Sequence, residues 1–441
     1  MVATGGGADL PSKERKEVNG SKQKELVLCA LPWPQEGAQR AIKALKDTFD
    51  DVDVEYFQRT DNTEIPADLL TRASYLATLF WLPSQPSDLP NTQFIQFFSA
   101  GTNHVAQHPI YTESKIPLCS ANGVHGPQIA EWVIMMDLVH SHNYTKLYGL
   151  QQKREWKPSA GMNVSDRVGK RVGILGYGSI GRQGKYRLFL QNSSIGLDVT
   201  NVSQCQNGRI PGLPVEVACK YSALYTIRHQ PLSMHPRSYT AYDPRGELNA
   251  VARVAKAMAM DIIAYTASPR KTPESKHDNG YIVPGTGDPK GELPSEWYSG
   301  TTREDVHEFL KQEIDLLVIA VPLTEKTRHV LSTPEFELLH KSNPRGTYVA
   351  NIARGPIIDQ KALVDALEKG LIKGAALDVT DPEPLPADDP LWTAPNVLIT
   401  PHISGSSDVY ADRGFQLLIE QIKRKRSGKK LINEVNRERG Y

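Results

Sequence analysis

The chain has 441 residues, of which 39% are hydrophobic and 23% charged, and its formal net charge is +1. This length is enough for two or three domains with a large core, and the near-zero net charge gives no electrostatic reason to expect a nucleic-acid or membrane partner. Four cysteines without paired spacing argue against a disulfide framework and fit a reducing compartment. No apolar run approaches the ~18 residues of a membrane span. We therefore expect a soluble, cytoplasmic protein.

The first part of the chain alternates between strand and helix patterns. Residues 1–24 have no apolar core and mix acids with bases, so we expect a disordered tail there. The apolar run ELVLCALPW (25–33) predicts a buried strand, and GAQRAIKALKDTF predicts a helix. Further strands are predicted in VDVEYF, YLATLFWL and FIQFFSAG, and a long helix runs from IAEWVIMMDLVH to about Leu150. Such alternation is typical of a parallel sheet with crossover helices.

A second alternating unit begins at RVGILGYGSIG, residues 171–181. Further strands are predicted at 261–267, 315–323, 347–354, 374–379 and 396–402, with helices in REDVHEFLKQ, TPEFELLHKS and QKALVDALEKG. A last helix from about Ser407 could pack back onto the first domain. We expect an α/β protein with two doubly wound parallel-sheet domains. A flavodoxin-like substrate domain (25–133 and 403–441) would hold an inserted dinucleotide-binding Rossmann domain (134–402).

The glycine-rich stretch 176–181 reads G-Y-G-S-I-G, the pattern of a loop that holds a dinucleotide pyrophosphate at the start of a helix. The helical pattern stops after Gln183, and residues 184–250 show no sustained period. When Gln183 is joined to Val251, helical spacing reappears across Ile180, Val251 and Val254. The segment 184–250 is therefore interpreted as an insertion into the nucleotide-binding unit.

The genetic code offers a cause for this insertion. Codons for Gly-Lys-Tyr (184–186) can contain GTAAGT, an intron start, and codons for Asn-Ala-Val (249–251) can contain the CAG of an intron end. Removing 184–250 keeps the reading frame. We interpret the segment as a translated, retained intron or a gene-model error. The less favoured alternative is a genuine family-specific loop, because loops of this length inside a compact domain are uncommon.

Three polar clusters follow predicted strands, where open α/β sheets bind ligands. They are NIARG with Arg354, DPEPLP with Glu383 and TPHISG with His402. Taken singly, each has an ordinary structural reading. Together they suit reduction of a 2-oxo acid, which needs a cation for the carboxylate and developing oxyanion, and a proton donor near neutral pH. Glu383 would orient the imidazole and raise its pKa, and the hydride would come from a nicotinamide.

In these motifs and their order, the chain resembles the D-isomer-specific 2-hydroxyacid dehydrogenase family, over about residues 25–183 and 251–441. The resemblance implies an NAD(P)-dependent oxidoreductase of D-2-hydroxy acids, active in reducing 2-oxo acids such as glyoxylate or hydroxypyruvate. It implies catalytic roles for Arg354, Glu383 and His402. Glu383 in place of Gln argues against the formate dehydrogenase branch, which the long insert YIVPGTGDPKGELP would otherwise suggest.

The resemblance also implies binding residues. Together with Arg354, the backbone N–H groups of three loop residues would bind the substrate carboxylate: Ala100, Gly101 and Thr102. The implied cofactor-binding set, in which Val321 to Thr324 lie along the cofactor and Asp378 faces the nicotinamide carboxamide, is Gly176, Gly178, Ser179, Ile180, Gly181, Thr266, Ser268, Arg270, Val321, Pro322, Thr324, Ile352, Asp378, His402 and Gly405. No metal is implied.

The choice between the two nicotinamide cofactors rests on IIAYTASPRK. An acidic residue at the end of this strand would repel a 2′-phosphate, but the chain has Thr266, with Ser268, Arg270 and Lys271 close behind. Hydroxyls and bases suit a 2′-phosphate. We therefore expect NADP(H) in preference to NAD(H), although NAD(H) stays open.

Two further questions stay open on the sequence. The alternative function is a dinucleotide-sensing binding module that resembles the C-terminal binding protein corepressors, which share this fold. We expect a small-molecule substrate, no nucleic-acid or membrane partner, and a homodimer with the 134–150 region as its contact. The particular 2-hydroxy acid is not identified: Phe80, Trp81 and Leu82 either limit the substrate side chain or are ordinary core residues.

Overall fold

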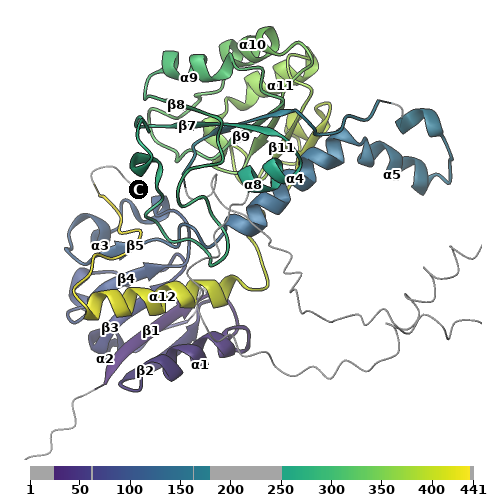
Figure 1. Ribbon diagram of the computed structural model, residues 1–441. Helices are drawn as coiled ribbons and strands as arrows, with labels where there is room; N and C mark the ends of the chain where they lie inside the picture. Colours follow the sequence, from purple (N-terminus) through teal and green to yellow (C-terminus); the bar gives the residue numbers. More distant parts are fainter. Residues whose placement is uncertain (1–23, 61–62, 162, 179–250, 438–441) are drawn as a thin grey trace, which may run out of the picture. The chain divides into compact units, whose positions relative to one another are not determined.

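The computed structural model describes residues 24–60, 63–161, 163–178 and 251–437 (Figure 1). The expected tail, apart from its last residue, and the segment 184–250 lie outside these ranges. All of the described residues fall within one compact unit.

The first sheet has five parallel strands in the order β2-β1-β3-β4-β5. Its strands are β1 (Glu25–Leu31), β2 (Val52–Gln58), β3 (Ala73–Thr78), β4 (Phe94–Phe97) and β5 (Leu118–Cys119). This strand order is the flavodoxin-like one. The four strands predicted from the sequence in this region are all present, and the short β5 is an addition.

Helices cover both faces of the first sheet because side chains alternate along each strand. On one face, Val27 and Leu31 of β1 pack with α1 (Gln39–Thr48) and α12 (Tyr410–Arg426). These two helices lie side by side (Figure 1). The other face packs with residues of α3 (Pro109–Thr112) and is flanked by α2 (Ala67–Arg72). The expected return of the last helix to the first sheet is confirmed, with its start at Tyr410.

The second sheet has seven parallel strands in the order β12-β11-β10-β9-β6-β7-β8, which is the Rossmann order with one further strand at an edge. Its strands are β6 (Arg171–Leu175), β7 (Asp261–Thr266), β8 (Glu296–Ser299), β9 (Leu316–Ile319), β10 (Tyr348–Asn351), β11 (Gly374–Leu377) and β12 (Val397–Ile399). The two parallel-sheet α/β units predicted from the sequence are thereby confirmed. The boundaries at 133 and 402 remain predictions.

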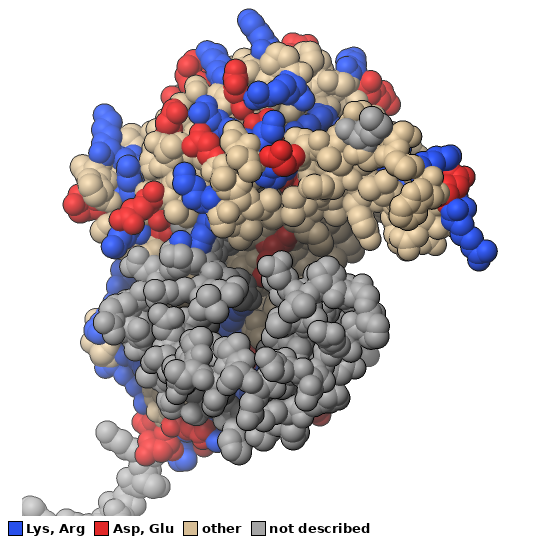
Figure 2. Space-filling view, turned by 45° about the vertical axis from the view of Figure 1, so that its right-hand side comes forward, with Lys and Arg blue, Asp and Glu red and all other residues tan. Residues whose placement is uncertain are grey.

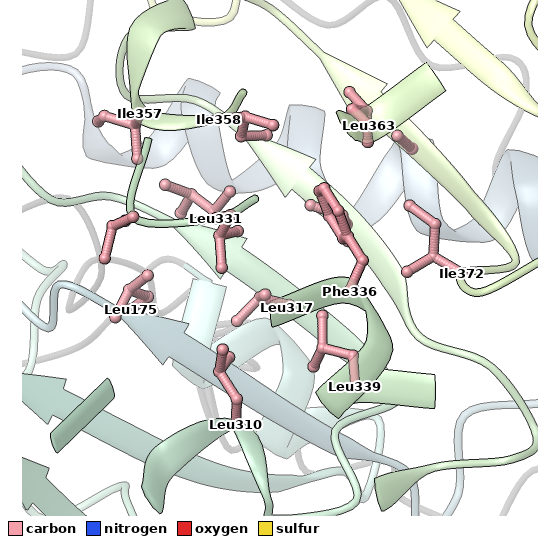
Figure 3. Packing of buried hydrophobic residues seen from close by; sticks show 14 of the residues in the cluster. Leu175, Leu310, Leu317, Leu331, Phe336, Leu339, Ile357, Ile358, Leu363 and Ile372 are labelled. Carbon is pink, nitrogen blue, oxygen red and sulfur yellow. The ribbon is translucent and has the colours of Figure 1, made fainter. Parts of the chain in front are cut away.

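The second sheet is also covered on both faces. One face packs with α9 (Arg303–Leu310), α10 (Thr333–Ser342) and α11 (Gln360–Glu368), and Figure 3 shows Leu310, Phe336 and Leu339 converging on Leu317 of β9. The other face packs with α4 (Gly126–Ser141) and α8 (Val251–Ala257). Leu316 belongs to this second cluster and its neighbour Leu317 to the first, as period-two alternation requires.

One sequence expectation for this part is wrong, and one strand was missed. The predicted long helix to Leu150 is two helices, because α4 ends at Ser141 and α5 covers Tyr144–Gln152. Asn143 between them has a φ of 54°, a left-handed conformation that interrupts a helix and that asparagine tolerates well. Strand β8 was not predicted, since its four residues follow a long irregular connection.

The described surface carries both signs of charge. On the face seen in Figure 2, basic and acidic side chains are interspersed over the part that is not grey. In the basic run 423–430, Arg424 pairs with Glu420, and Arg426 pairs with Glu25 and Asp51. No helix among the described residues is long and apolar enough to cross a bilayer, and no cluster of three metal-ligating side chains occurs among them.

Candidate active site

His402 and Glu383 form a direct pair. The distance between His402 Nδ1 and Glu383 Oε1 is 2.6 Å, and both side chains are partly exposed. This contact leaves Nε2 as the imidazole atom that can meet a substrate. The sequence predicted the partnership across loops that follow two different strands, and the structure brings the two side chains together.

Asp378 holds the loop that carries His402. Its side chain is 1% exposed, and its two oxygens accept hydrogen bonds from the backbone N–H groups of Ile403 (2.8 Å) and Ser404 (2.9 Å) and from the Thr400 hydroxyl (2.6 Å). His402 itself donates its N–H to the Asp378 carbonyl at 2.9 Å and has a φ of 55°. A non-glycine residue in this conformation is strained and is held there by its surroundings. That Asp378 also faces the nicotinamide carboxamide stays a prediction.

Arg354 lies in a tight turn directly after β10. The buried Asn351 side chain fixes this turn, because its oxygen accepts the Ala353 N–H and its amide donates to the Arg354 carbonyl, both at 3.1 Å. Gly355 follows, where a Cβ atom would collide with the Thr380 backbone. Burial lowers the pKa of the Arg354 guanidinium, and the charge of Glu383 opposes that shift. His402 and Glu383 are thus in contact, and the charge of Glu383 acts on Arg354.

The loop 99–102 offers free hydrogen-bond donors. Among the described residues, no hydrogen bond occupies the backbone N–H groups of Ala100, Gly101 or Thr102, although the Ser99 hydroxyl donates to the Gly101 carbonyl at 2.9 Å. Backbone donors that lack protein acceptors are suited to bind an anion. Burial, followed by the charge of Arg354, lowers the pKa of the nearby His104.

The glycine turn, residues 176–178, lies against the start of the loop after β9. Gly176 has a φ of 103°, and a Cβ there would lie 2.6 Å from the Ala320 carbonyl carbon and from the Val321 nitrogen. Only glycine fits this approach. The expected cofactor residues Gly176, Gly178 and Val321 therefore occur in one region, while Ser179, Ile180 and Gly181 lie outside the described residues.

The end of β7 is where the cofactor preference was predicted. Thr266 is 7% exposed, and its hydroxyl donates to the Ser268 carbonyl at 2.8 Å. Arg270 donates from Nη1 to the Ser275 carbonyl, whereas Ser268 and Lys271 are exposed. The side chains that are open to a ligand here are thus Ser268 and Lys271.

The other expected cofactor residues are distributed over three strand ends. Thr324 is partly buried, and its backbone N–H donates to the Thr327 hydroxyl. That hydroxyl in turn donates to the Pro322 carbonyl at 2.7 Å. Ile352 is buried after β10. The Gly405 carbonyl accepts a hydrogen bond from Gln128 Nε2 at 2.8 Å. Their roles toward a cofactor remain predictions.

The three side chains after β3 have different environments. Leu82 is buried and Trp81 is partly buried in the same core cluster, where Arg59 lies over the Trp81 ring. Phe80 is 60% exposed and meets the His104 ring edge-on, with centroids 4.9 Å apart. Leu82 is therefore a core residue, Trp81 is partly so, and Phe80 is the most exposed of the three.

Sequence reasoning missed His125, which precedes α4. Its Nε2 lies 2.7 Å from the Tyr410 hydroxyl, which donates to the Phe98 carbonyl at 2.6 Å. Burial lowers the pKa of His125 to about 4, so the ring is neutral at physiological pH. This chain of contacts fastens the start of α12 to the segment that precedes the 99–102 loop. No sequence motif marked it.

Comparison with known proteins gives a consistent result. Residues 288–404 match the family described as "D-isomer specific 2-hydroxyacid dehydrogenase, NAD binding domain". The glyoxylate/hydroxypyruvate reductase B of an Enterobacter species is 45% identical over 100 residues, which are 23% of this chain and 30% of that protein. The glyoxylate reductase of Korarchaeum cryptofilum is 30% identical over 217 residues, 47% of this chain and 57% of that protein.

A solved structure supports the fold over a larger part of the chain. The NADPH-dependent glyoxylate/hydroxypyruvate reductase from Sinorhizobium meliloti, in complex with NADP and sulfate, aligns with a TM-score of 0.62 at 22% identity, covering 95% of this chain and 100% of that one. At this identity the likeness concerns the fold. The chain spans less than two thirds of the curated relatives it matches.

Proposed function

We propose that this chain, which carries the NAD-binding domain of the D-isomer-specific 2-hydroxyacid dehydrogenase family, is an NAD(P)-dependent reductase of small 2-oxo acids such as glyoxylate or hydroxypyruvate. The observation that carries the proposal is the 2.6 Å pair of His402 and Glu383 beside Arg354. A proton donor, its orienting carboxylate and a substrate cation are the groups that carbonyl reduction needs. The reverse direction would oxidise D-2-hydroxy acids.

Each residue has a defined task in this proposal. Arg354 binds the substrate carboxylate and polarises the carbonyl oxygen, aided by the free N–H groups of the 99–102 loop. His402 gives a proton from Nε2 to that oxygen, and Glu383 holds Nδ1 and so orients the imidazole ring. A bound nicotinamide supplies the hydride. Exposed Phe80 borders the substrate side chain.

The glycine turn fits a dinucleotide because Gly176 admits no side chain and lets two backbone segments approach. Gly176, Gly178 and Val321 would hold it. Two observations support a preference for NADP(H). Ser268 and Lys271 are exposed, and position 266 holds a threonine and not an acidic residue. The reductase names of the curated relatives favour an enzyme over a corepressor-like binding module.

A homodimer in the cytoplasm is part of the same proposal. Large apolar side chains are exposed along α4, α5 and the segment after them. They are Met135, Tyr144, Leu147, Tyr148 and Trp156, of which Trp156 is 94% exposed. Exposed apolar side chains of this size suit contact with a second copy of the chain. We predict a native mass of two chains by light scattering, and a monomer for Tyr148→Glu. A monomeric wild type would contradict the dimer alone.

Steady-state kinetics test the proposed activity. Glyoxylate, hydroxypyruvate and a larger 2-oxo acid are each offered with NADH and with NADPH, and cofactor oxidation is followed by absorbance. Turnover with a lower KM for NADPH is the expected result. Cofactor binding without turnover of any of these substrates would favour the binding module.

A further inference from the structure

The connection between β7 and β8, residues 267–295, contacts the glycine turn at one end of its course. Parallel neighbouring strands are usually joined through a helix, but the only helical turn in this connection is the 3-10 turn Glu274–Lys276. Asp288 organises the part that precedes β8. It is 4% exposed, and its carboxylate accepts hydrogen bonds from the N–H groups of Glu292 (2.8 Å) and Leu293 (3.2 Å).

Asp288 also reaches the dinucleotide motif itself. The hydroxyl of Tyr177, the second residue of G-Y-G-S-I-G, donates to Asp288 Oδ2 at 3.0 Å. A carboxylate this deeply buried is stable only when hydrogen bonds replace its water shell, and Tyr177 supplies one of them. Tyr177 and Asp288 are 111 positions apart in the sequence, and no local sequence pattern predicts their contact.

Tyr177 is held from several sides. It is 1% exposed, its ring meets Trp297 edge-on with centroids 5.1 Å apart, and its N–H donates to the Tyr265 carbonyl at 2.8 Å. It stands between Gly176 and Gly178, whose backbone has little conformational restriction of its own. The anchored Tyr177 side chain therefore restrains the backbone between these two glycines.

The middle of the connection is anchored to the first sheet. Tyr281 and Val283 pack into a cluster with Ala121, Val124 and Leu417 of α12. The Tyr281 N–H donates to Asn433 Oδ1 at 3.5 Å, and Asn433 donates in turn to the Asn122 carbonyl at 2.6 Å. The connection is thus held at its middle by these contacts and, closer to β8, by the hydrogen bonds of Asp288.

We propose that Asp288 is a positioning residue for the cofactor: through the Tyr177 hydroxyl it holds the glycine turn in the conformation that receives a dinucleotide pyrophosphate. The inference rests on the proposed function for the identity of the ligand. It assigns a role to the 267–295 connection, which carries no residue of the proton-transfer site. The affinities for NAD(H) and NADP(H) depend equally on Asp288, since both cofactors contain the pyrophosphate.

The test compares two tyrosine-to-phenylalanine substitutions in the full chain. Tyr177→Phe removes the hydroxyl that Asp288 accepts, whereas Tyr281→Phe removes a buried hydroxyl that has no hydrogen-bond partner among the described residues. NADH and NADPH are titrated by nicotinamide fluorescence. We expect Tyr177→Phe to raise both dissociation constants about tenfold, and Tyr281→Phe to stay within about twofold. The KM for cofactor should rise while kcat at saturating cofactor is unchanged.

Asp288→Asn completes the experiment. If the two side chains act as one unit, Tyr177→Phe adds no further loss of affinity in the Asp288→Asn background. Unchanged dissociation constants in Tyr177→Phe, with only a lower melting temperature in Asp288→Asn, would overturn the inference and leave the proposed function intact. A wild-type chain that binds neither cofactor would overturn both.

Discussion

At the scale of single residues, His402 combines the proton-donor position with a left-handed backbone. Its φ of 55° is tolerated by asparagine better than by most side chains. Alanine would thus change the loop as well as the chemistry, whereas asparagine changes the chemistry with less strain. The choice of substitution follows from the backbone.

We predict that His402→Asn lowers kcat by about 100-fold or more, because an amide cannot donate the proton, while the NADPH dissociation constant changes less than about twofold. Steady-state kinetics and fluorescence titration measure the two effects. His340→Asn, at an exposed histidine in the last turn of α10, is the control and should keep wild-type turnover. Near-normal turnover of His402→Asn would remove His402 from proton transfer.

His140 gives a prediction about acid stability. Its ring stacks on Tyr348 with centroids 4.3 Å apart, and burial, then the charges of Lys373 and Arg167, lowers its pKa to about 4. The unfolded chain, with a pKa near 6.5, takes up the proton first. Stability from this group is therefore present above about pH 6.5 and is lost as the pH falls toward 4.

His140→Phe keeps the stacking and removes the titration. Between pH 7 and pH 5, the wild type should lose more unfolding free energy than this variant, by on the order of 1 kcal/mol. Urea unfolding at the two pH values measures the difference. Equal losses in both proteins would show that His140 is protonated in the folded state at pH 5.

At the scale of elements, α10 depends on one buried carboxylate. Glu335 has 0% exposure, accepts two hydrogen bonds from Arg303 at 2.7 and 2.8 Å, and lies 2.6 Å from His307 Nε2. It also accepts the Ser332 N–H at 3.0 Å as part of the capping box that begins the helix. The guanidinium and the cap together compensate the burial of the charge.

Arg303→Met should lower the unfolding free energy by about 1–2 kcal/mol, because the buried Glu335 loses its cation, although the Arg303 side chain itself is 48% exposed. Lys369→Met is the control: the Lys369 side chain is 64% exposed and lies 3.8 Å from the exposed carboxylate of Asp365, so its loss should cost less than about 0.5 kcal/mol. Urea unfolding compares the two. Similar small effects would mean that His307 and the capping box are enough to stabilise the buried carboxylate of Glu335.

Most strands and helices could be predicted from the sequence where their apolar pattern was strong. TPEFELLHKS is a helix over the predicted residues, and the apolar runs of the second sheet are its central strands. The break at Asn143 was not predicted because no Gly or Pro marks it. Strand β8 is short, and its pairing with β7 depends on residues distant in the sequence, which periodicity does not report.

The site was predictable to a similar extent. Arg354, Glu383 and His402 could be found because each follows a strand end in a motif, and the structure brings them together. The Asp288–Tyr177 and His125–Tyr410 contacts join residues more than a hundred positions apart. Side-chain hydrogen bonds of this kind depend on the tertiary fold and have no local signature.

At the scale of the whole molecule, the segment 184–250 interrupts the nucleotide-binding unit. Before it, β6 ends at Leu175 and enters the glycine turn, and after it α8 begins at Val251, whose side chain is buried in one cluster with Tyr177. Helix α8 therefore occupies the place of the helix that follows a dinucleotide loop. A continuous helix there would offer its N-terminal N–H groups to the pyrophosphate.

We propose that the chain without 184–250 binds NADPH at least about tenfold more tightly, because closing so long a loop has an entropic cost of several kcal/mol. Both chains are expressed and titrated with NADPH by fluorescence. Sequencing the transcript tests the origin of the segment. Equal affinity of the two chains, or a dominant message that contains these codons, would support a genuine structural element.

The return of α12 to the first sheet has a consequence for synthesis on the ribosome. Phe415, Leu418 and Ile422 of α12 cover Val27 and Leu31 of the first strand, and Arg426 pairs with Glu25. At ~5–20 residues per second, translation places tens of seconds between these segments. We expect the nascent first sheet to expose an apolar face during that time and to engage chaperones until the last helix emerges.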